Sequence, residues 1–316
     1  MKLPISPRLI GQSAGLFCLS IACWGQLTQA GEFNLDKTTA EAEKGVAEAQ
    51  FQLGAAYLHG DGATKDEARA RTLLQQAAGQ GHSMAQNHLG VMYLQGQGGK
   101  ADAEEGLKLL RQSAGQGNAT AQNNLGFILA EGKSVTQDRS EAATWYRKAA
   151  EQGLALAQFR LGTFYYFGDG GLTKDYAEAL HWHRRAADQG LAQAQNSVGV
   201  IYRFGLGVKV DFKTAGEWFL KAAEQGDAKA QGSLGALYSS NTGLGQNKPL
   251  AYQWLKIGSD QGEVTADNLL YDFQQTLTPE EIAEGERLVA AFRARNPAAA
   301  PKPKGEKPPQ LRPAGD

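Results

Sequence analysis

Cysteine is almost absent from this chain of 316 residues, because its only 2 cysteines, Cys18 and Cys23, lie near the amino terminus. The rest of the chain therefore contains no disulfide framework and no cysteine nucleophile. An excess of charge is absent too, since 32 Lys and Arg residues face 33 Asp and Glu residues. A near-zero net charge excludes a nucleic-acid binder that works by bulk electrostatic attraction.

Proline is scarce, and 6 of the 10 prolines lie in the last 20 residues. Glycine is abundant, with 39 residues, against a usual share of about 7 %. The hydrophobic content of 42 % and the charged content of 21 % are ordinary for a globular protein. Little proline and much glycine in the body of the chain predict many helices with many closely spaced ends.

Residues 1–30 have the pattern of a secretory signal. Lys2 and Arg8 give a positive start, an apolar run follows at 16–24, and Thr28-Gln29-Ala30 supplies small residues before a cut at Gly31. We therefore expect a periplasmic or secreted protein. Two alternatives remain open: an uncleaved membrane anchor, and a lipid-modified Cys23, because residues 20–23 loosely match a bacterial lipobox. Contact with a membrane is expected only under these alternatives.

The strongest signal in the sequence is a repeat of 36 or 37 residues. Its pattern is Ala-Gln, two variable residues, Leu-Gly, two variable residues and Tyr, as in Ala49-Gln50, Leu53-Gly54 and Tyr57. The glycine recurs at Gly54, Gly90, Gly126, Gly162, Gly199 and Gly235. Apolar and small residues at this spacing form one stripe of a helix.

A second pattern completes each repeat. It starts at Asp66, Asp102, Asp138, Asp175, Asp211 or Asn247, and it ends at Gly81, Gly117, Gly153, Gly190, Gly226 or Gly262. Asp and Asn are good N-caps, so we expect them to open a second helix. The closing glycine should adopt the left-handed conformation that ends this helix. Glycine inside the first helix costs about 1 kcal/mol of helix propensity, so its recurrence predicts close helix–helix approach.

One helix pair of this size cannot bury its own apolar face, whereas six stacked pairs can. The fold class expected is therefore all-α, an α/α solenoid. The predicted solenoid covers 31–296, with repeats at about 45–81, 82–117, 118–153, 154–190, 191–226 and 227–262. Residues 36–44 and 263–296 are expected to cap its ends, with an N-cap at Thr278 and Pro279 opening the last helix. Residues 297–316, rich in Pro and Lys, are predicted to form a disordered tail.

These repeats resemble the Sel-one-like repeat (SLR) family, a relative of the tetratricopeptide repeat. The resemblance rests on the Ala-Gln-x-x-Leu-Gly-x-x-Tyr runs, the Gly-x-Gly links and closing runs such as Ala149-Ala150-Glu151-Gln152-Gly153. It implies a right-handed superhelix that acts as a non-enzymatic scaffold or adaptor in the bacterial envelope. Some relatives are linked to β-lactam binding or hydrolysis, but they carry paired cysteines that these repeats lack. A cell-wall or β-lactam ligand binder or hydrolase is kept as the alternative.

The resemblance also implies that the first helices line a concave face on which a protein or an extended peptide docks. Two groups of residues fall on that face. The first group is aromatic with one arginine: Phe159, Tyr166, Phe167, Arg203 and Phe204. Aromatic residues and Arg dominate interface energies, although packing between repeats explains such residues equally well. The second group is Asn87, Asn123 and Asn196, whose amides could hold a peptide backbone or simply belong to the repeat consensus.

Signatures of catalysis and of cofactor binding are missing from the sequence. The histidines lack the spacing of a zinc site, and no phosphate-binding loop or nucleophilic serine elbow is present. We therefore expect no enzyme activity, no metal and no cofactor. The sequence leaves the partner and the oligomeric state open.

Overall fold

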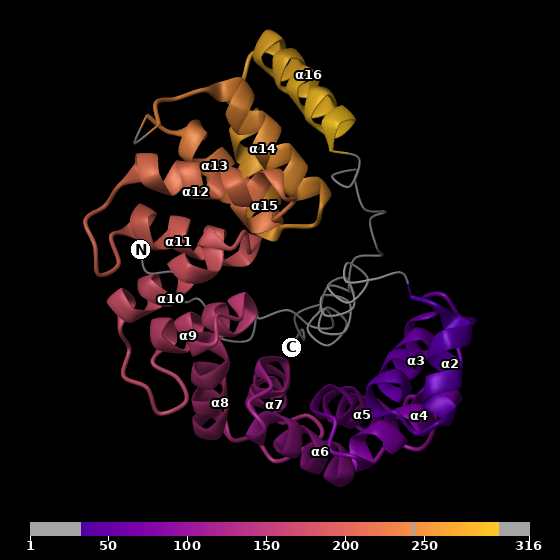
Figure 1. Ribbon diagram of the computed structural model, residues 1–316. Coiled ribbons are helices and arrows are strands. Elements are labelled where there is room, and N and C mark those ends of the chain that lie inside the picture. Colours follow the sequence, from indigo (N-terminus) through magenta and orange to yellow (C-terminus); the bar gives the residue numbers. More distant parts are fainter. Residues whose placement is uncertain (1–32, 242–243, 297–316) are drawn as a thin grey trace, which may run out of the picture. The chain divides into compact units, whose positions relative to one another are not determined.

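The computed structural model describes residues 33–241 and 244–296 (Figure 1). Within these residues the chain forms fifteen helices and no strand. The chain divides into two compact units, Met1–Ala157 with Asp169–Leu172, and Gln158–Gly168 with Thr173–Asp316. The predicted signal at 1–30, including Cys23, and the predicted tail at 297–316 lie outside the described residues.

Each repeat is a helix pair, and the pairs stack in order within each unit. The first helices are α3 (Ala47–His59), α5 (Ser83–Gln95), α7 (Ala119–Glu131), α9 (Ala155–Phe167), α11 (Ala192–Phe204) and α13 (Ala228–Ser239). The second helices are α4 (Glu67–Gly79), α6 (Ala103–Gly115), α8 (Arg139–Glu151), α10 (Tyr176–Asp188), α12 (Phe212–Glu224) and α14 (Lys248–Asp260). Within a unit, a second helix also packs against the next first helix, as α4 does on α5. The predicted all-α solenoid is confirmed.

The residues that begin and end the second helices behave as predicted. Asp66 accepts hydrogen bonds from the backbone amides of Ala68 and Arg69, at 3.1 and 3.0 Å. The other five predicted N-caps also accept from amides of their own helix. The six closing glycines have φ between 83° and 93°, which is the left-handed conformation.

The glycine inside each first helix marks a close approach of two helices, as predicted. A Cβ atom at Gly90 would lie 2.8 Å from Leu110 Cγ and 2.9 Å from the carbonyl oxygen of Gly106. The other five glycines face Leu74, Tyr146, His183, Phe219 and Leu255 in the same way. Each of these partners lies 20 or 21 residues after its glycine. The missing side chain is therefore the space that a large residue of the second helix fills.

A ladder of glutamine pairs ties the repeats together. Buried Gln86 of α5 donates through Nε2 to the carbonyl oxygen of Ala78, at the end of α4, at 3.3 Å. Its Oε1 accepts from Gln116 Nε2 at 2.7 Å. The same glutamine pair recurs in all six repeats. One buried amide thus bonds to its own second helix and, in five of the repeats, to the preceding helix as well.

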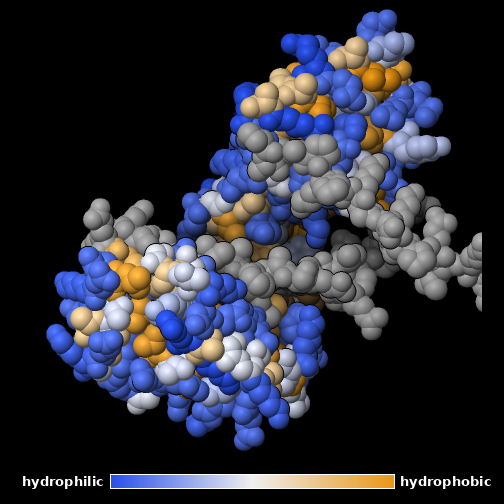
Figure 2. All heavy atoms as spheres, turned by 90° about the vertical axis from the view of Figure 1, so that its right-hand side faces the viewer, coloured by the Kyte–Doolittle hydropathy of each residue, from blue (hydrophilic) through white to orange (hydrophobic). Residues whose placement is uncertain are grey.

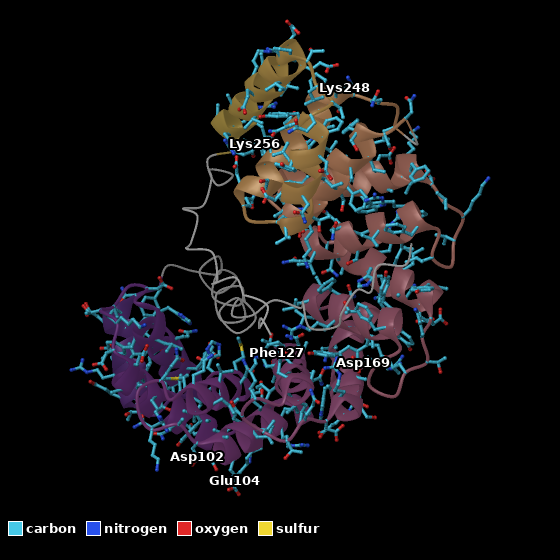
Figure 3. All side chains as sticks on the ribbon, turned by 180° about the vertical axis from the view of Figure 1, so that it is seen from behind. Asp102, Glu104, Phe127, Asp169, Lys248 and Lys256 are labelled. Atoms are coloured by element: carbon cyan, nitrogen blue, oxygen red, sulfur yellow. The ribbon has the colours of Figure 1, made fainter. Side chains whose placement is uncertain are left out.

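Three helices cap the repeats: α2 (Leu35–Glu43), α15 (Val264–Gln274) and α16 (Pro279–Arg295). The capping box predicted at Thr278 is present, with Glu281 as its partner. Lys248 and Lys256 lie along α14 (Figure 3), where Lys248 pairs with Glu281 of α16 at 3.1 Å. No helix in the described part of the chain has both the length and the apolar character needed to cross a membrane.

Candidate binding surface

Two neighbouring repeats of the second unit end their first helices on predicted site residues. Tyr166 and Phe167 close α9, and Arg203 and Phe204 occupy the same two repeat positions in α11. A glycine with positive φ follows each pair, at Gly168 and Gly205. Because the chain turns away at these glycines, the four side chains stand at helix ends, next to the Gly-rich links.

The aromatic residues of the fourth repeat pack on one another. The Tyr166 ring lies 4.9 Å from the Phe167 ring and 5.2 Å from the Tyr176 ring, edge-on in both cases. Burial and the nearby Tyr176 raise the pKa of the Tyr166 hydroxyl. Phe167 remains 39 % exposed at the edge of this cluster. The fourth repeat therefore offers solvent a rigid aromatic edge.

The link of the fifth repeat packs against Tyr176 at the start of α10. A Cβ atom at Gly207 would lie 3.0 Å from Tyr176 Cβ, so the link at 205–210 passes directly over Tyr176. A Cβ atom at Gly205 would lie 2.7 Å from Val210 Cγ2, so Val210 folds back against the residue that follows Phe204. Tyr176 thereby connects the aromatic residues of the fourth repeat to the link of the fifth.

Arg203 and Phe204 form the most exposed part of this region. The Phe204 ring is 59 % exposed, and Val210 is 45 % exposed. The Arg203 guanidinium lies 5.1 Å from the centre of the Phe204 ring. Arg203 is only partly exposed, and burial lowers the pKa of its guanidinium. We call the set Tyr166, Phe167, Tyr176, Arg203, Phe204 and Val210 the aromatic–arginine surface.

Phe159 does not join the aromatic–arginine surface through any ring contact in the described residues. Its ring is partly buried and lies 5.4 Å from the ring of His183. His183 is the residue that fills the space at Gly162. The surroundings of Phe159 therefore favour a role in packing within the fourth repeat.

The three predicted asparagines have different surroundings. Asn87 is 5 % exposed, and its Oδ1 accepts from Asn124 Nδ2 at 2.9 Å. Asn123 is fully buried, whereas Asn196 is partly exposed. Because a peptide backbone cannot reach a buried amide, these surroundings favour packing for Asn87 and Asn123. The amide ladder along a peptide stays a prediction.

Tyr176 and Val210 are members of the surface that we did not predict from the sequence. Val210 precedes the N-cap Asp211, at a position that holds Lys65, Ala101, Gln137, Lys174 and Gln246 in the other repeats. A branched apolar residue at this mostly polar position is the signal that could have identified it.

The described part of the chain shows no arrangement of side chains for metal binding. Within 33–241 and 244–296, no group of three or more His, Cys, Asp or Glu side chains is arranged to hold a metal ion. On the face shown in Figure 2 the surface is mostly hydrophilic, with smaller groups of apolar side chains. A small exposed apolar group beside a cation suits recognition of another chain better than bond-making chemistry.

Comparison with known proteins supports this interpretation. The Sel1 repeat model matches six times, at residues 47–82, 83–118, 119–154, 155–191, 192–227 and 228–263. Among curated proteins, none is significantly similar to the chain.

Two solved structures are similar in both sequence and fold. A Sel1 repeat protein from Oxalobacter formigenes is 31 % identical, with a TM-score of 0.67 over 82 % of this chain and 99 % of that one. The protein c5321, a protective antigen of uropathogenic Escherichia coli with an SLR fold, is 29 % identical, with a TM-score of 0.55 over 83 % of this chain. The matched region spans 64 % of the length of c5321.

Six consecutive matches cover more than half of the chain, and they coincide with the six helix pairs. Sel1 repeats are generally a non-catalytic scaffold fold through which proteins interact. The chain belongs to the Sel1 repeat family.

Proposed function

We propose that this protein is a non-enzymatic scaffold that binds a protein or an extended peptide through the aromatic–arginine surface. The observation that carries the proposal is the exposed Phe204 ring beside the partly buried Arg203 guanidinium. A solvent-exposed aromatic ring on a rigid helix end can bury a large apolar area at little cost in side-chain entropy.

The shape of the surface supports binding rather than further packing of the solenoid. Tyr166 and Tyr176 are partly buried, whereas Phe204 and Val210 are exposed. Phe167 is exposed as well, although its ring contacts Tyr166. Aromatic and Arg residues are enriched among the few residues that dominate binding energy at interfaces. We therefore expect Phe204 and Arg203 to contribute most of the binding energy, and Phe167 to extend the contact.

A comparison of two variants tests this proposal. Cross-linked partners are captured from an envelope extract with the wild-type protein, with Phe167→Ala/Phe204→Ala, and with Val264→Ala. Val264 is a matched control, because it is also apolar, 69 % exposed and located in the second unit, on α15. A partner lost by the double variant and kept by the control supports the surface. A partner kept equally by both variants contradicts it.

We further propose that the protein acts in the bacterial envelope, after export by the signal predicted at residues 1–30. The positive start, the apolar run and the small residues before Gly31 support this location. The mass of the protein purified from its own cells tests it. A chain that starts at Gly31 supports export with cleavage, and a lipid on Cys23 supports export with a membrane anchor. An intact chain recovered in the cytoplasmic fraction would contradict the proposed location.

A further inference from the structure

We propose that the segment bound by the aromatic–arginine surface carries an Asp or Glu side chain next to an aromatic or aliphatic residue. In this arrangement Arg203 receives the carboxylate, while Phe204 and Val210 receive the apolar side chain. The inference rests on the proposed function, and it adds the chemistry of the partner.

The first step is that Arg203 is a partly buried cation that lacks an anionic partner in the described part of the chain. In the described part of the chain, Arg203 has no carboxylate within ion-pair distance and no hydrogen-bond acceptor. Burial is the only cause that shifts its pKa, and it lowers the pKa. Arg111 shows the usual arrangement, because both of its terminal nitrogens donate to Glu141, at 2.5 and 2.8 Å. A partly buried guanidinium without such a partner is stabilised when a carboxylate docks on it.

The second step is the charge of the surroundings. Lys174 lies over the Tyr176 ring at 4.7 Å, and Lys209 is exposed in the link beside Val210. The nearby carboxylates are already used as N-caps: Asp175 accepts from two amides of α10, and Asp211 accepts from the amide and the hydroxyl of Thr214. Three cations, Arg203, Lys174 and Lys209, thus stand against two carboxylates that already accept hydrogen bonds within their own helices. This excess of positive charge complements an acidic segment.

The third step is that the cation is specific to one repeat. The position of Arg203 is held by Leu58, Leu94, Ala130, Tyr166 and Ser239 in the other repeats. None of these residues is charged, so the repeat fold does not require a cation at this position. A charge that folding does not require, placed between exposed apolar groups, points to recognition of an anion with an apolar neighbour.

The geometry also sets how close the two groups of the partner must lie. Arg203 and Phe204 are adjacent in sequence, and the guanidinium lies 5.1 Å from the ring centre. The carboxylate and the apolar side chain of the partner must therefore lie within a few ångströms of each other, as side chains of one short segment can. A planar guanidinium holds a carboxylate through two parallel hydrogen bonds, which a lysine cannot reproduce.

A pair of dipeptides tests this inference on the full chain. Acetyl-Asp-Phe-amide carries the carboxylate and the ring, and acetyl-Asn-Phe-amide has the same shape without the charge. Binding is measured by NMR from the shifts of the backbone amides at 203–210. We expect the Asp dipeptide to bind about 10-fold more tightly than the Asn dipeptide, which is the usual scale of a charge-assisted pair. Added salt should reduce this preference.

Three variants assign the preference to Arg203. Arg203→Gln should remove the preference for Asp, and Arg203→Lys should retain only part of it. Arg185→Gln is the matched control, because Arg185 is an exposed cation over the Trp182 ring, at 5.1 Å, in the same unit. This control should bind both dipeptides as the wild type does.

The outcomes separate this inference from the proposed function. If both dipeptides bind equally and Phe204→Ala binds neither, Arg203 does not recognise a carboxylate, and this inference is overturned. The surface would then remain a docking site. A preference for Asp that survives Arg203→Gln would assign the anion to another residue and also overturn the inference. Absence of shifts at 203–210 with either dipeptide would contradict it as well, and the capture experiment above would then judge the proposed function separately.

Discussion

His183 is buried in a position that the other repeats fill with Leu, Tyr or Phe. Its Nδ1 atom has no hydrogen-bond partner among the residues described, and burial lowers the pKa of its imidazole to about 3. The folded protein therefore keeps this ring neutral at pH values where an exposed histidine takes up a proton. At this scale, a single core position makes the stability of the second unit depend on pH.

The direction of this dependence follows from the two pKa values. The ordinary value is 6.5, and the folded value is about 3. Between these values the unfolded chain binds a proton that the folded chain does not bind. The free energy of unfolding therefore falls as the pH drops below 6.5, by up to about 1.4 kcal/mol per pH unit.

We predict that His183→Phe removes this loss of stability. The ring should fit, because Phe219 fills the same space at Gly199 in the next repeat. Relative to the wild type, the variant should gain about 2 kcal/mol more at pH 5 than at pH 7. Urea unfolding at both pH values measures the difference. His181→Gln is the control, since His181 is exposed, and an equal gain in both variants would contradict the prediction.

At the scale of one element, the glycine inside each first helix lowers helix propensity but allows close packing against the second helix. Gly90 lies inside α5, yet Leu110 and the backbone of α6 occupy the place of its missing side chain. Gly115 ends α6, and a Cβ atom there would meet nothing within 4 Å. The same residue type therefore has opposite roles at the two positions.

We predict opposite effects of alanine at these two glycines. Gly90→Ala should destabilise the protein by about 2 kcal/mol, because the overpacking exceeds the gain in helix propensity. Gly115→Ala should be neutral or stabilise by up to about 1 kcal/mol. Thermal unfolding followed by circular dichroism compares them. A Gly90→Ala variant as stable as the wild type would show that the helices do not need this close contact.

The glutamine ladder gives a second prediction at this scale. Gln86→Leu removes the donor to Ala78 and the acceptor of Gln116. The Ala78 carbonyl oxygen then keeps the Gly81 amide as its donor, and Gln116 Nε2 loses its acceptor. We therefore expect a loss of about 1–3 kcal/mol. Gln112→Leu changes an exposed glutamine on α6, so it should leave the melting temperature nearly unchanged. Equal melting temperatures of the two variants would contradict a structural role for the ladder.

The helices could be predicted from the sequence because their signals are local. Asp66 and Gly81 mark the two ends of one helix by capping chemistry alone. Gly54 recurs in every repeat, and this recurrence predicts the close approach of the two helices of a pair. The glutamine pairs were missed because Gln86 and Gln116 lie 30 residues apart in the sequence. The sequence also does not distinguish these glutamines from exposed ones such as Gln112. Only the folded repeat shows which of these glutamines meet.

The candidate site was predicted only in part, for the same reason. The period placed Tyr166 with Arg203, and Phe167 with Phe204, at equivalent positions of the first helices, and in the structure these positions end α9 and α11. Their place on a concave face stays a prediction. The burial of Asn87 depends on its contact with Asn124 of the next repeat, 37 residues away, and no local pattern reveals it. The role of Tyr176 likewise depends on a link from another repeat.

At the scale of the whole molecule, both units use one repeated helix pair, so the scaffold itself carries little information about the partner. The exposed side chains at the ends of the first helices differ between repeats, and they can distinguish one partner from another. The aromatic–arginine surface belongs to the second unit alone. We therefore expect binding to depend on two neighbouring repeats and to tolerate substitutions on other exposed residues.

The most direct test of this account is site-specific photo-cross-linking in the cells that make the protein. A photoreactive phenylalanine replaces Phe204 in one sample and Tyr271 in another, since Tyr271 is also an aromatic residue of the second unit and is 72 % exposed. We expect one dominant cross-linked protein from position 204, which Arg203→Gln weakens, and no such product from position 271. Equal products from both positions, or a product from position 271 alone, would contradict the claim that partners dock on the aromatic–arginine surface.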